Sequence, residues 1–370
     1  MLQDSSSFLP DTSEAFDRKA TPPAPSHEYE LRQLAESQKH SDIKFDPPWQ
    51  IYLNHVADLL KFNKRDDSAP PISEFPYRQS EYILQNSWLL SVACSLSQIG
   101  LDWLNTLYFD DITTLKLDGH TKEFRFTLGN PKMGVGNHDP VEVVITSTLP
   151  YFTSAYNRDV EGFVCSNWNQ VVSSRPKPKT GPFWFLLLEK AVAQMIGSYG
   201  DLQGGDPRNA FHILTKPQSL TVFSIPDPTF ATGEAFLEMC STIADRDDSS
   251  FFVVAQIRAD KLRETSAKKG SKGEILSHFD QYCTVLGCHK AKPGPLKISE
   301  MPKWIFKVKD FYNSSEDMPF KNPSMLSWAL SYAFIKELGF SPARDKKTGI
   351  SFMTEKVFCE WFQKLIICQI

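Results

Sequence analysis

Long apolar runs are missing from this sequence of 370 residues. The longest strongly apolar stretch, Phe183 to Leu188, is far shorter than the roughly 20 residues that a transmembrane helix needs, so we predict no membrane span. The N-terminus, MLQDSSSFLPDTSEAF, has no basic region followed by an apolar one, which predicts no signal peptide. Positive charge is not in excess either, because the net charge is -4. This balance argues against nucleic acid as a main partner.

Paired cysteines and familiar catalytic motifs are also missing. The seven cysteines include no CxxC pair, and Cys283 and Cys288 stand too far apart for a zinc finger. Free thiols of this kind predict a reducing, intracellular location, that is, the cytoplasm. The sequence has no GxSxG elbow, no Walker lysine and no HExxH. The two glycines within Met133 to Asn137 predict a hairpin loop and not a phosphate-binding loop.

What the sequence does contain is enough apolar material for a large core, since 41% of its residues are hydrophobic. Residues 1–41 are rich in Ser, Pro and charge, and we predict a mobile tail. Apolar residues at helical spacing predict a buried helix from Ser87 to about Leu107. Alternating and β-branched residues predict strands at 123–128 and 141–150.

The clearest helical pattern is GPFWFLLLEKAVAQMIGSYG, residues 181–200, whose apolar residues share one face and whose glycines close the end. After a chain break at LQGGDP, the pattern changes. The basic run at 268–272 predicts a solvated loop. The C-terminal segment is apolar to its last residue, which predicts a tail packed in the core. Three strands are predicted in this half, separated by loops rich in Lys, Gly and Pro: 249–257, 282–288 and 303–311.

The stretch LQNSWLLSVACSL, Leu84 to Leu96, poses the main chemical question. A side chain at the start of a helix is a usual place for an activated nucleophile. Local sequence favours the simpler interpretation that Ser87 is a helix N-cap. A nucleophilic serine also needs a base and a group that orients the base. The histidines are scattered, and His212 is expected to be a partly buried structural residue.

Several segments, taken in order, resemble the protease core of the calpains, a family of papain-like cysteine proteases. FWFLLLEKAVAQMIGSYGDLQGG resembles the family pattern FW-x-x-LLEKA-x-A-x-x-x-GSY-x-x-L-x-GG. The strand pair is similar to one that ends in V-V-x-D-D-x-L-P, and FMTEKVFCEWFQKLIICQI is similar to the closing segment F-x-x-F-x-x-L-x-I-C-x-L. The resemblance runs from about Phe45 to the last residue. It implies an α+β, two-lobed papain-like fold with a helical lobe at 42–207 and an antiparallel, β-rich lobe at 208–370.

The family opens its catalytic helix with Q-G-x-x-G-D-C-W-L-L, and Trp88-Leu89-Leu90 match the end of this motif. The resemblance then places the nucleophilic cysteine at Ser87 and the preceding aspartate at Asn86. Aligned without gaps, the oxyanion-hole glutamine falls on Glu81, while Gln79 and Gln85 are reached only with a gap. The glycines of the motif are missing.

The family's histidine strand, G-H-A-Y-S-V-x-G, corresponds to residues 280–287, which puts Gln281 at the histidine position. The asparagine of R-N-P-W-G falls on Asp310. A serine hydroxyl is a poor nucleophile without a base, and a glutamine amide cannot take its proton. Glu81 would oppose a developing oxyanion, and strand alternation points His278 away from the face of Gln281. We therefore expect degenerate positions and no catalytic residue.

Active calpain cores bind calcium, as the resemblance implies, but the family's acidic pair falls here on Thr146 and Ser147. Calcium needs clustered carboxylate and carbonyl oxygens, so we expect no required metal and no other cofactor. Two functions stay open, with inactivity favoured. One is a catalytically inactive protein that binds other proteins as a structural or regulatory component of a cytoskeletal or ciliary assembly, which the resemblance to triad-less members implies. The alternative is an active peptidase with an unrecognised nucleophile such as Cys94, although its place two turns along the helix favours a buried structural cysteine.

Overall fold

The structure, a computed structural model, forms two compact units, residues 1–216 and 217–370. The predicted tail at 1–41 and the predicted hairpin loop at 133–137 lie outside the residues that the structure describes. The described ranges are 43–46, 77–78, 86–99, 123–131, 140–146, 149–152, 175–176, 184–197, 200–202, 204–227, 233–244, 250–269, 280–292, 302–311 and 349–370.

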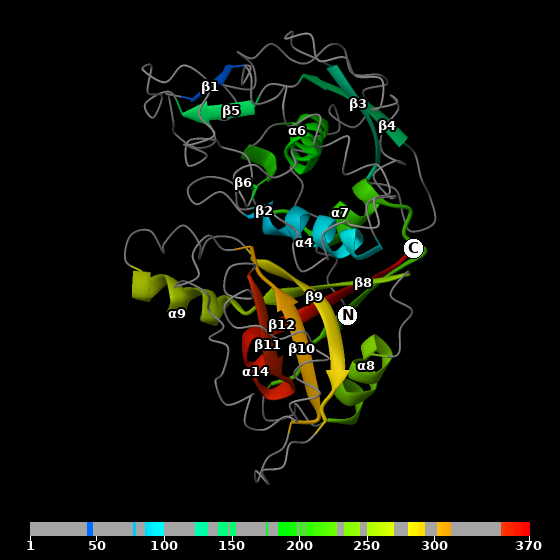
Figure 1. Ribbon diagram of the computed structural model, residues 1–370, viewed down its shortest axis with the longest axis vertical. Helices are drawn as coiled ribbons and strands as arrows, with labels where there is room; N and C mark the ends of the chain where they lie inside the picture. The colour runs from blue at the N-terminus through cyan, green and yellow to red at the C-terminus, as the bar shows by residue number, and fades with distance from the viewer. Residues whose placement is uncertain are drawn as a thin grey trace, which may run out of the picture. The chain divides into compact units, whose positions relative to one another are not determined.

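The first unit combines helices with antiparallel strand pairs (Figure 1). Its described α-helices are α4 (Ser87–Leu96), α6 (Trp184–Ile196) and α7 (Pro207–Leu214), with short 3-10 helices η2 (Ser97–Ile99) and η6 (Gly200–Leu202). Its strand pairs are β1 (Ile43–Asp46) with β5 (Leu149–Phe152), β2 (Tyr77–Arg78) with β6 (Arg175–Pro176), and β3 (Glu123–Gly129) with β4 (Pro140–Thr146).

Helix α6 packs against the β3–β4 pair. Phe124 and Phe126 are buried while Arg125 between them is exposed, because successive strand residues face opposite ways. Gln194 Nε2 donates to the backbone oxygen of Val144 at 3.0 Å and ties the helix to β4. The helix ends at Gly197, whose φ of 135° few other residues adopt. The predicted helix and the strand predicted at 123–128 are confirmed. The strand predicted at 141–150 is confirmed only as far as Thr146, because Leu149 and Pro150 belong to β5, which pairs with β1.

Helix α4 has no charged residue, and all ten of its residues are buried. A helix that is uncharged and buried on every side belongs in a core, so the predicted buried helix is confirmed. Its expected continuation beyond residue 99 lies outside the described residues. Helix α7 packs against α4 and has a favourable start. Asp206 caps it by accepting the backbone N–H of Arg208 at 2.8 Å, and Pro207 occupies the first turn.

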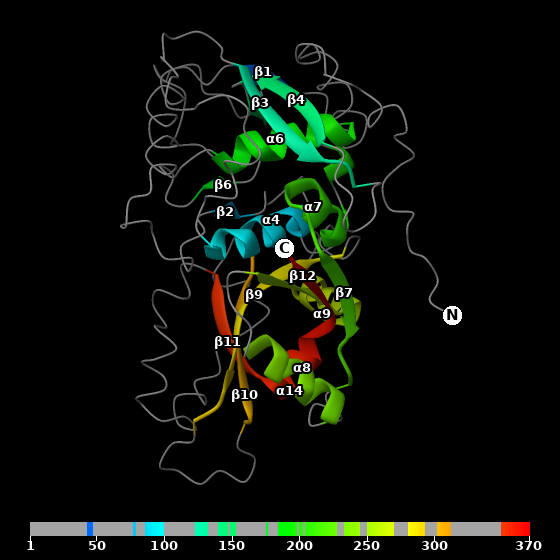
Figure 2. The same ribbon diagram turned by 90° about the vertical axis from the view of Figure 1, so that its right-hand side faces the viewer.

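The second unit is built on a six-stranded antiparallel sheet in the order β11-β10-β9-β8-β12-β7 (Figure 2). The strands are β7 (Ser219–Ser224), β8 (Phe251–Ile257), β9 (Tyr282–Lys290), β10 (Trp304–Lys309), β11 (Ile350–Thr354) and β12 (Phe362–Gln369). The three strands predicted in this half correspond to β8, β9 and β10 and are confirmed. The C-terminal segment is also in the core, because β12 lies between β8 and β7.

Helices α8 (Glu234–Ala244) and α14 (Glu355–Trp361) pack on one face of this sheet, where they close its hydrophobic core (Figure 2). Phe306 of β10 lies at the centre of the core, and its ring stacks on that of Phe358 with 3.9 Å between centroids. Thr354 caps α14 by accepting the backbone N–H of Val357 at 3.4 Å. The core also contains Val253 of β8 and Phe362 of β12, so it joins the last strand to one formed more than a hundred residues earlier.

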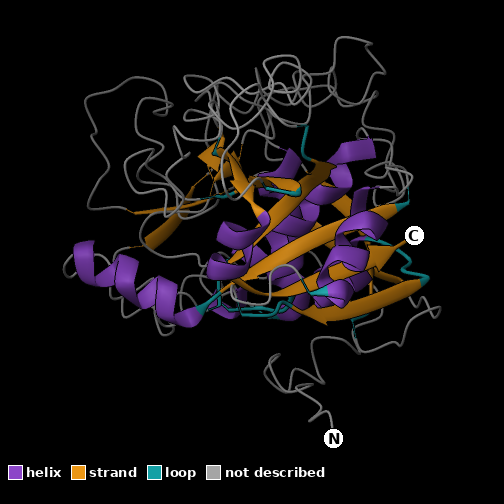
Figure 3. Ribbon diagram, turned by 90° about the horizontal axis from the view of Figure 1, so that it is seen from below, coloured by secondary structure: helices purple, strands orange, loops and turns teal. Residues whose placement is uncertain are grey.

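A further helix, α9 (Ala259–Lys269), follows β8 and extends away from the sheet (Figures 1 and 3). This corrects the prediction of loops alone between the strands, and the basic run predicted as a loop begins in the helix. The residues ADKLRETSAKK are mostly good helix formers and include no Gly or Pro before Gly270. Lysines near a helix C-terminus also suit its negative end.

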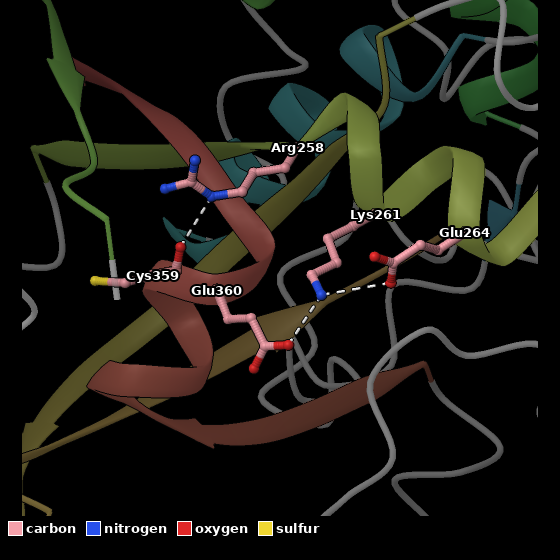
Figure 4. A network of polar contacts seen from close by, with 5 residues as sticks. All are labelled: Arg258, Lys261, Glu264, Cys359 and Glu360. Carbon is pink, nitrogen blue, oxygen red and sulfur yellow. Dashed lines mark hydrogen bonds and ion pairs between the residues drawn. The ribbon is translucent and has the colours of Figure 1, made fainter. Parts of the chain in front are cut away.

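Arg258, at the junction of β8 and α9, connects three parts of the second unit (Figure 4). Its Nε donates to the backbone oxygen of Cys359 at 2.9 Å, and one terminal nitrogen donates to that of Pro226 at 3.0 Å. Nearby, Lys261 pairs with Glu360 at 3.0 Å and with Glu264 at 3.4 Å. The guanidinium of Arg258 thus donates to backbone oxygens in α14 and just after β7. The ion pairs of Lys261, in contrast, are made with exposed carboxylates.

Helices and antiparallel sheets together confirm the predicted α+β class. The division into units falls after Lys216, and α7, which begins at Pro207, belongs to the first unit. Among the described residues, no helix is long and apolar enough to cross a membrane.

Candidate functional site

Ser87 is the first residue of α4, and Asn86 is its N-cap. The backbone oxygen of Asn86 accepts the N–H groups of Leu89 at 3.0 Å and Leu90 at 3.1 Å, which defines the cap position. The interpretation of Ser87 as the cap is therefore wrong by one residue, and the cap side chain makes no capping bond. Ser87 is 2% exposed at the positive end of the helix.

The side chain of Asn86 instead reaches across the first unit to α6. Its Nδ2 donates to Glu189 Oε2 at 2.5 Å, and both residues are fully buried. A buried carboxylate requires donors, and an amide supplies one where an aspartate could not. This bond connects the residue before Ser87 to the LLEKA segment of α6. No local pattern in the sequence predicts it.

Trp88 anchors α4 to the chain just before α7. Its indole N–H donates to the backbone oxygen of Leu202 at 2.7 Å. Gly205 lies against the indole so closely that an added Cβ would stand 2.3 Å from Cε2 of Trp88. Gly204 beside it has a φ of 67°, a conformation that favours glycine. Leu202 and Gly205 thus hold the indole from the segment just before α7.

The cysteines with described positions are all buried and carry free thiols. Cys94, the rival nucleophile, is 0% exposed within α4, so its expected burial is confirmed. Burial raises the pKa of Cys368 to about 12, and burial beside Cys240 raises that of Cys359 to about 12. A thiol with such a pKa stays protonated and is a poor nucleophile.

Gln281 and Asp310 lie on one face of the sheet in the second unit. The backbone oxygen of Gln281 accepts the N–H of Ile257 at 2.9 Å, which continues the β8–β9 ladder by one pair. Lys309 pairs with Thr284, so Asp310 stands opposite Cys283, two residues from Gln281 along β9. Residues two apart on a strand share a face, so the two side chains are diagonal neighbours. Gln281 is 0% and Asp310 1% exposed.

Gly349 supports the backbone at Asp310. The N–H of Asp310 donates to the oxygen of Gly349 at 2.9 Å. Gly349 has a φ of 79°, and an added Cβ would lie 2.7 Å from the backbone oxygen of Asp310. Burial, with the charge of Asp310 added, raises the pKa of Cys283 well above its ordinary value. The thiol beside Asp310 therefore stays neutral.

The described histidines do not supply a base next to Asp310. His289 lies eight residues along β9 from Gln281, about 26 Å away at strand spacing. His212 belongs to α7 of the first unit and is half-buried, as predicted. Burial and the neighbouring charge of Arg208 lower the pKa of His212. Among the described residues of the second unit, no imidazole therefore lies beside Gln281.

Other predicted positions lie outside the described residues: Gln79, Glu81, Gln85, Ser147 and His278. Ser87 belongs to the first unit, whereas Gln281 and Asp310 belong to the second. Within the described ranges, no group of three or more His, Cys, Asp or Glu residues could hold a metal ion. Thr146, the first of the two residues at the position of the family's acidic pair, ends β4 and pairs with Glu123.

No curated protein matches the chain. The family model described as calpain family cysteine protease matches residues 80–369, which includes α4, α6 and the whole six-stranded sheet. Residues 80–369 make up most of the 370-residue sequence, so the chain belongs to the calpain family of cysteine proteases.

Proposed function

We propose that this calpain-family chain does not cleave peptides and acts by binding other proteins, as a structural or regulatory component. The observation that carries the proposal is the burial of Gln281 and Asp310 on one face of the sheet, since the family resemblance aligns Gln281 with the family's histidine. A primary amide neither accepts a proton at neutral pH nor donates one to a leaving group.

The nucleophile position supports the same proposal. Ser87 has a hydroxyl in place of a thiol, and a hydroxyl of ordinary pKa attacks a peptide only when a base removes its proton. Asp310 could orient an imidazole but has a neutral amide as its neighbour on the sheet. Losing one member of such a unit already removes most of the rate, so two losses leave little chemistry.

The packing around these positions is intact, which is what a binding role requires. Trp88 is held by Leu202 and Gly205, and Asp310 by Gly349. We propose that the two units are the lobes of a papain-like core and that the chain works without calcium. Its proposed place is the cytoplasm, in a cytoskeletal or ciliary assembly, which rests on the family resemblance alone.

The test compares four purified full-length chains on casein and a fluorogenic peptide, with and without calcium. They are the unmodified chain, Ser87→Cys, Gln281→His, and the double variant Ser87→Cys/Gln281→His. We expect no calcium-dependent cleavage by the unmodified chain or by either single variant. The double variant regains a thiol and an imidazole, so any restored cleavage should appear there alone.

Two outcomes contradict the proposal. Calcium-dependent cleavage by the unmodified chain would support the alternative function, an active peptidase with an unrecognised nucleophile. Cleavage by the single variant Ser87→Cys would mean that a histidine elsewhere in the chain, and not a residue at position 281, serves as the base. Cys94→Ser in the unmodified background then decides whether that cysteine carries any activity observed.

A further inference from the structure

Strand β7 forms one edge of the six-stranded sheet (Figure 2). The two edges differ in exposure. Every residue of β11 at the opposite edge is buried except Thr354, which is intermediate, whereas Thr221, Val222 and Ser224 of β7 are exposed. An exposed edge presents backbone donors and acceptors that another strand can pair with.

The register of β7 on β12 shows which backbone groups face outward. Ile225 N–H donates to the oxygen of Gln363 at 2.9 Å, and the ladder continues from there without a shift. Backbone groups alternate in an antiparallel ladder, so those of Leu220, Val222 and Ser224 point away from β12. In the described part of the chain, no strand pairs with β7 on that side.

The sequence of β7, SLTVFS, has none of the usual protection of an exposed edge. It contains no charged residue and no proline, and no bulge interrupts its pairing with β12. Val222 at its middle is 43% exposed, and no other large hydrophobic residue in the described ranges is classed as exposed. An uncharged edge of this length is suited to pairing with a further strand.

We propose that β7 pairs with β7 of a second copy of this chain, antiparallel about a twofold axis at Val222. The outward groups then form three hydrogen-bonded pairs: Val222 with Val222 of the partner copy, and Leu220 with Ser224 of the partner copy in both directions. Each pair exchanges two hydrogen bonds. The two exposed valines become direct neighbours, and the sheet continues across both copies.

Charge at the ends of β7 favours a second copy as the occupant. Lys216 precedes the strand and Asp227 follows it, and both are exposed. A twofold axis at Val222 brings Lys216 of one copy to the end where Asp227 of the other copy lies. Opposite charges therefore meet at both ends, and no like charges meet along the strand because β7 has none. Pro217 and Pro226 limit the pairing to this segment.

The first test is sedimentation velocity on the full-length chain from low to high micromolar concentration. We expect a concentration-dependent dimer. Val222→Pro should abolish it, because the N–H of residue 222 faces outward and its loss removes no bond to β12. Val222→Lys, which opposes two like charges on the axis, should do the same. Glu238→Lys, on an exposed part of α8, is the control and should leave the dimer unchanged.

Hydrogen exchange and charge reversal test the register. In the dimer, the amides of Leu220, Val222 and Ser224 should exchange more slowly at high protein concentration than at low. Lys216→Glu should weaken the dimer several-fold, and adding Asp227→Lys should restore it. A chain that stays monomeric throughout overturns the proposal. So does a dimer that persists in folded Val222→Pro and Val222→Lys, since another surface must then hold it. None of these results bears on the peptidase assay.

Discussion

The contact between Gly205 and Trp88 makes a quantitative prediction for Gly205→Ala. The new Cβ would lie 2.3 Å from Cε2 of the indole, whereas carbon atoms pack at about 3.5–4.0 Å. Trp88 cannot move aside easily, because it is 0% exposed and its N–H is bonded to Leu202. Overpacking of this kind costs about 1–3 kcal/mol, and we expect the upper end of that range.

A double-mutant cycle isolates this clash. Trp88→Phe alone loses the indole hydrogen bond, about 1 kcal/mol, and leaves a cavity, so it should also destabilise the chain. The smaller ring makes room for the new methyl group. The double variant should therefore be more stable than the sum of the two single effects predicts, by about 1–2 kcal/mol.

The measurement is equilibrium unfolding in urea, followed by circular dichroism. Gly204→Ala is the control, because its cost comes from a φ of 67° and not from Trp88. That cost should add to the cost of Trp88→Phe without coupling. If Gly205→Ala and Trp88→Phe are additive, or if Gly205→Ala leaves stability unchanged, Trp88 does not pack against Gly205 as described.

Three further predictions concern the second unit. Arg258→Ala should lower the free energy of unfolding by about 2–3 kcal/mol, because it removes the side-chain donor from two part-buried backbone oxygens, whereas Lys261→Ala should cost less than about 1 kcal/mol. Equal losses of stability in urea unfolding would contradict this. Cys359 and Cys368 have pKa values of about 12 in the folded chain against 9.0 ordinarily, so the folded state holds more protons between these values and stability should fall as pH rises through that window. The measurement is the urea midpoint of unfolding across this pH range, with the variant that has both cysteines changed to alanine as the control. A midpoint that does not change with pH would argue against the burial of the two thiols. Gly349→Ala should cost about 2–4 kcal/mol from its φ and the close backbone oxygen, as thermal unfolding can measure; an unchanged melting temperature would show that the turn adjusts.

The pattern of apolar residues in the sequence predicted the helices and strands that are packed in a core. Helix α6 follows from apolar residues at a spacing of about 3.6, because one of its faces must be buried. Strands β8, β9 and β10 follow from short apolar, β-branched runs between loops, and nearly all of their residues are buried. Helix α9 was missed because only Leu262 of its described residues is buried, so its sequence resembles a solvated segment. The N-cap was misplaced by one residue, since both Asn86 and Ser87 suit a cap.

The resemblance to the calpain family, which the family match confirms, came from ordered motifs in the sequence. It identified Ser87, Gln281 and Asp310 as positions of interest, but not what surrounds them. Only the register of β9 and β10 puts Gln281 and Asp310 on one face. Register depends on pairing between distant strands, and a shift of one residue would turn every side chain to the other face.

Contacts that hold the candidate site together were likewise decided by the tertiary structure. Asn86 meets Glu189 across 103 residues of chain, and Trp88 meets Leu202 across 114. A local pattern can show that a tryptophan or a glutamate will be buried, but not which donor or acceptor it will meet. The reason is physical: a buried polar group must be satisfied by whichever segment packs against it, and only the folded chain brings that segment within reach.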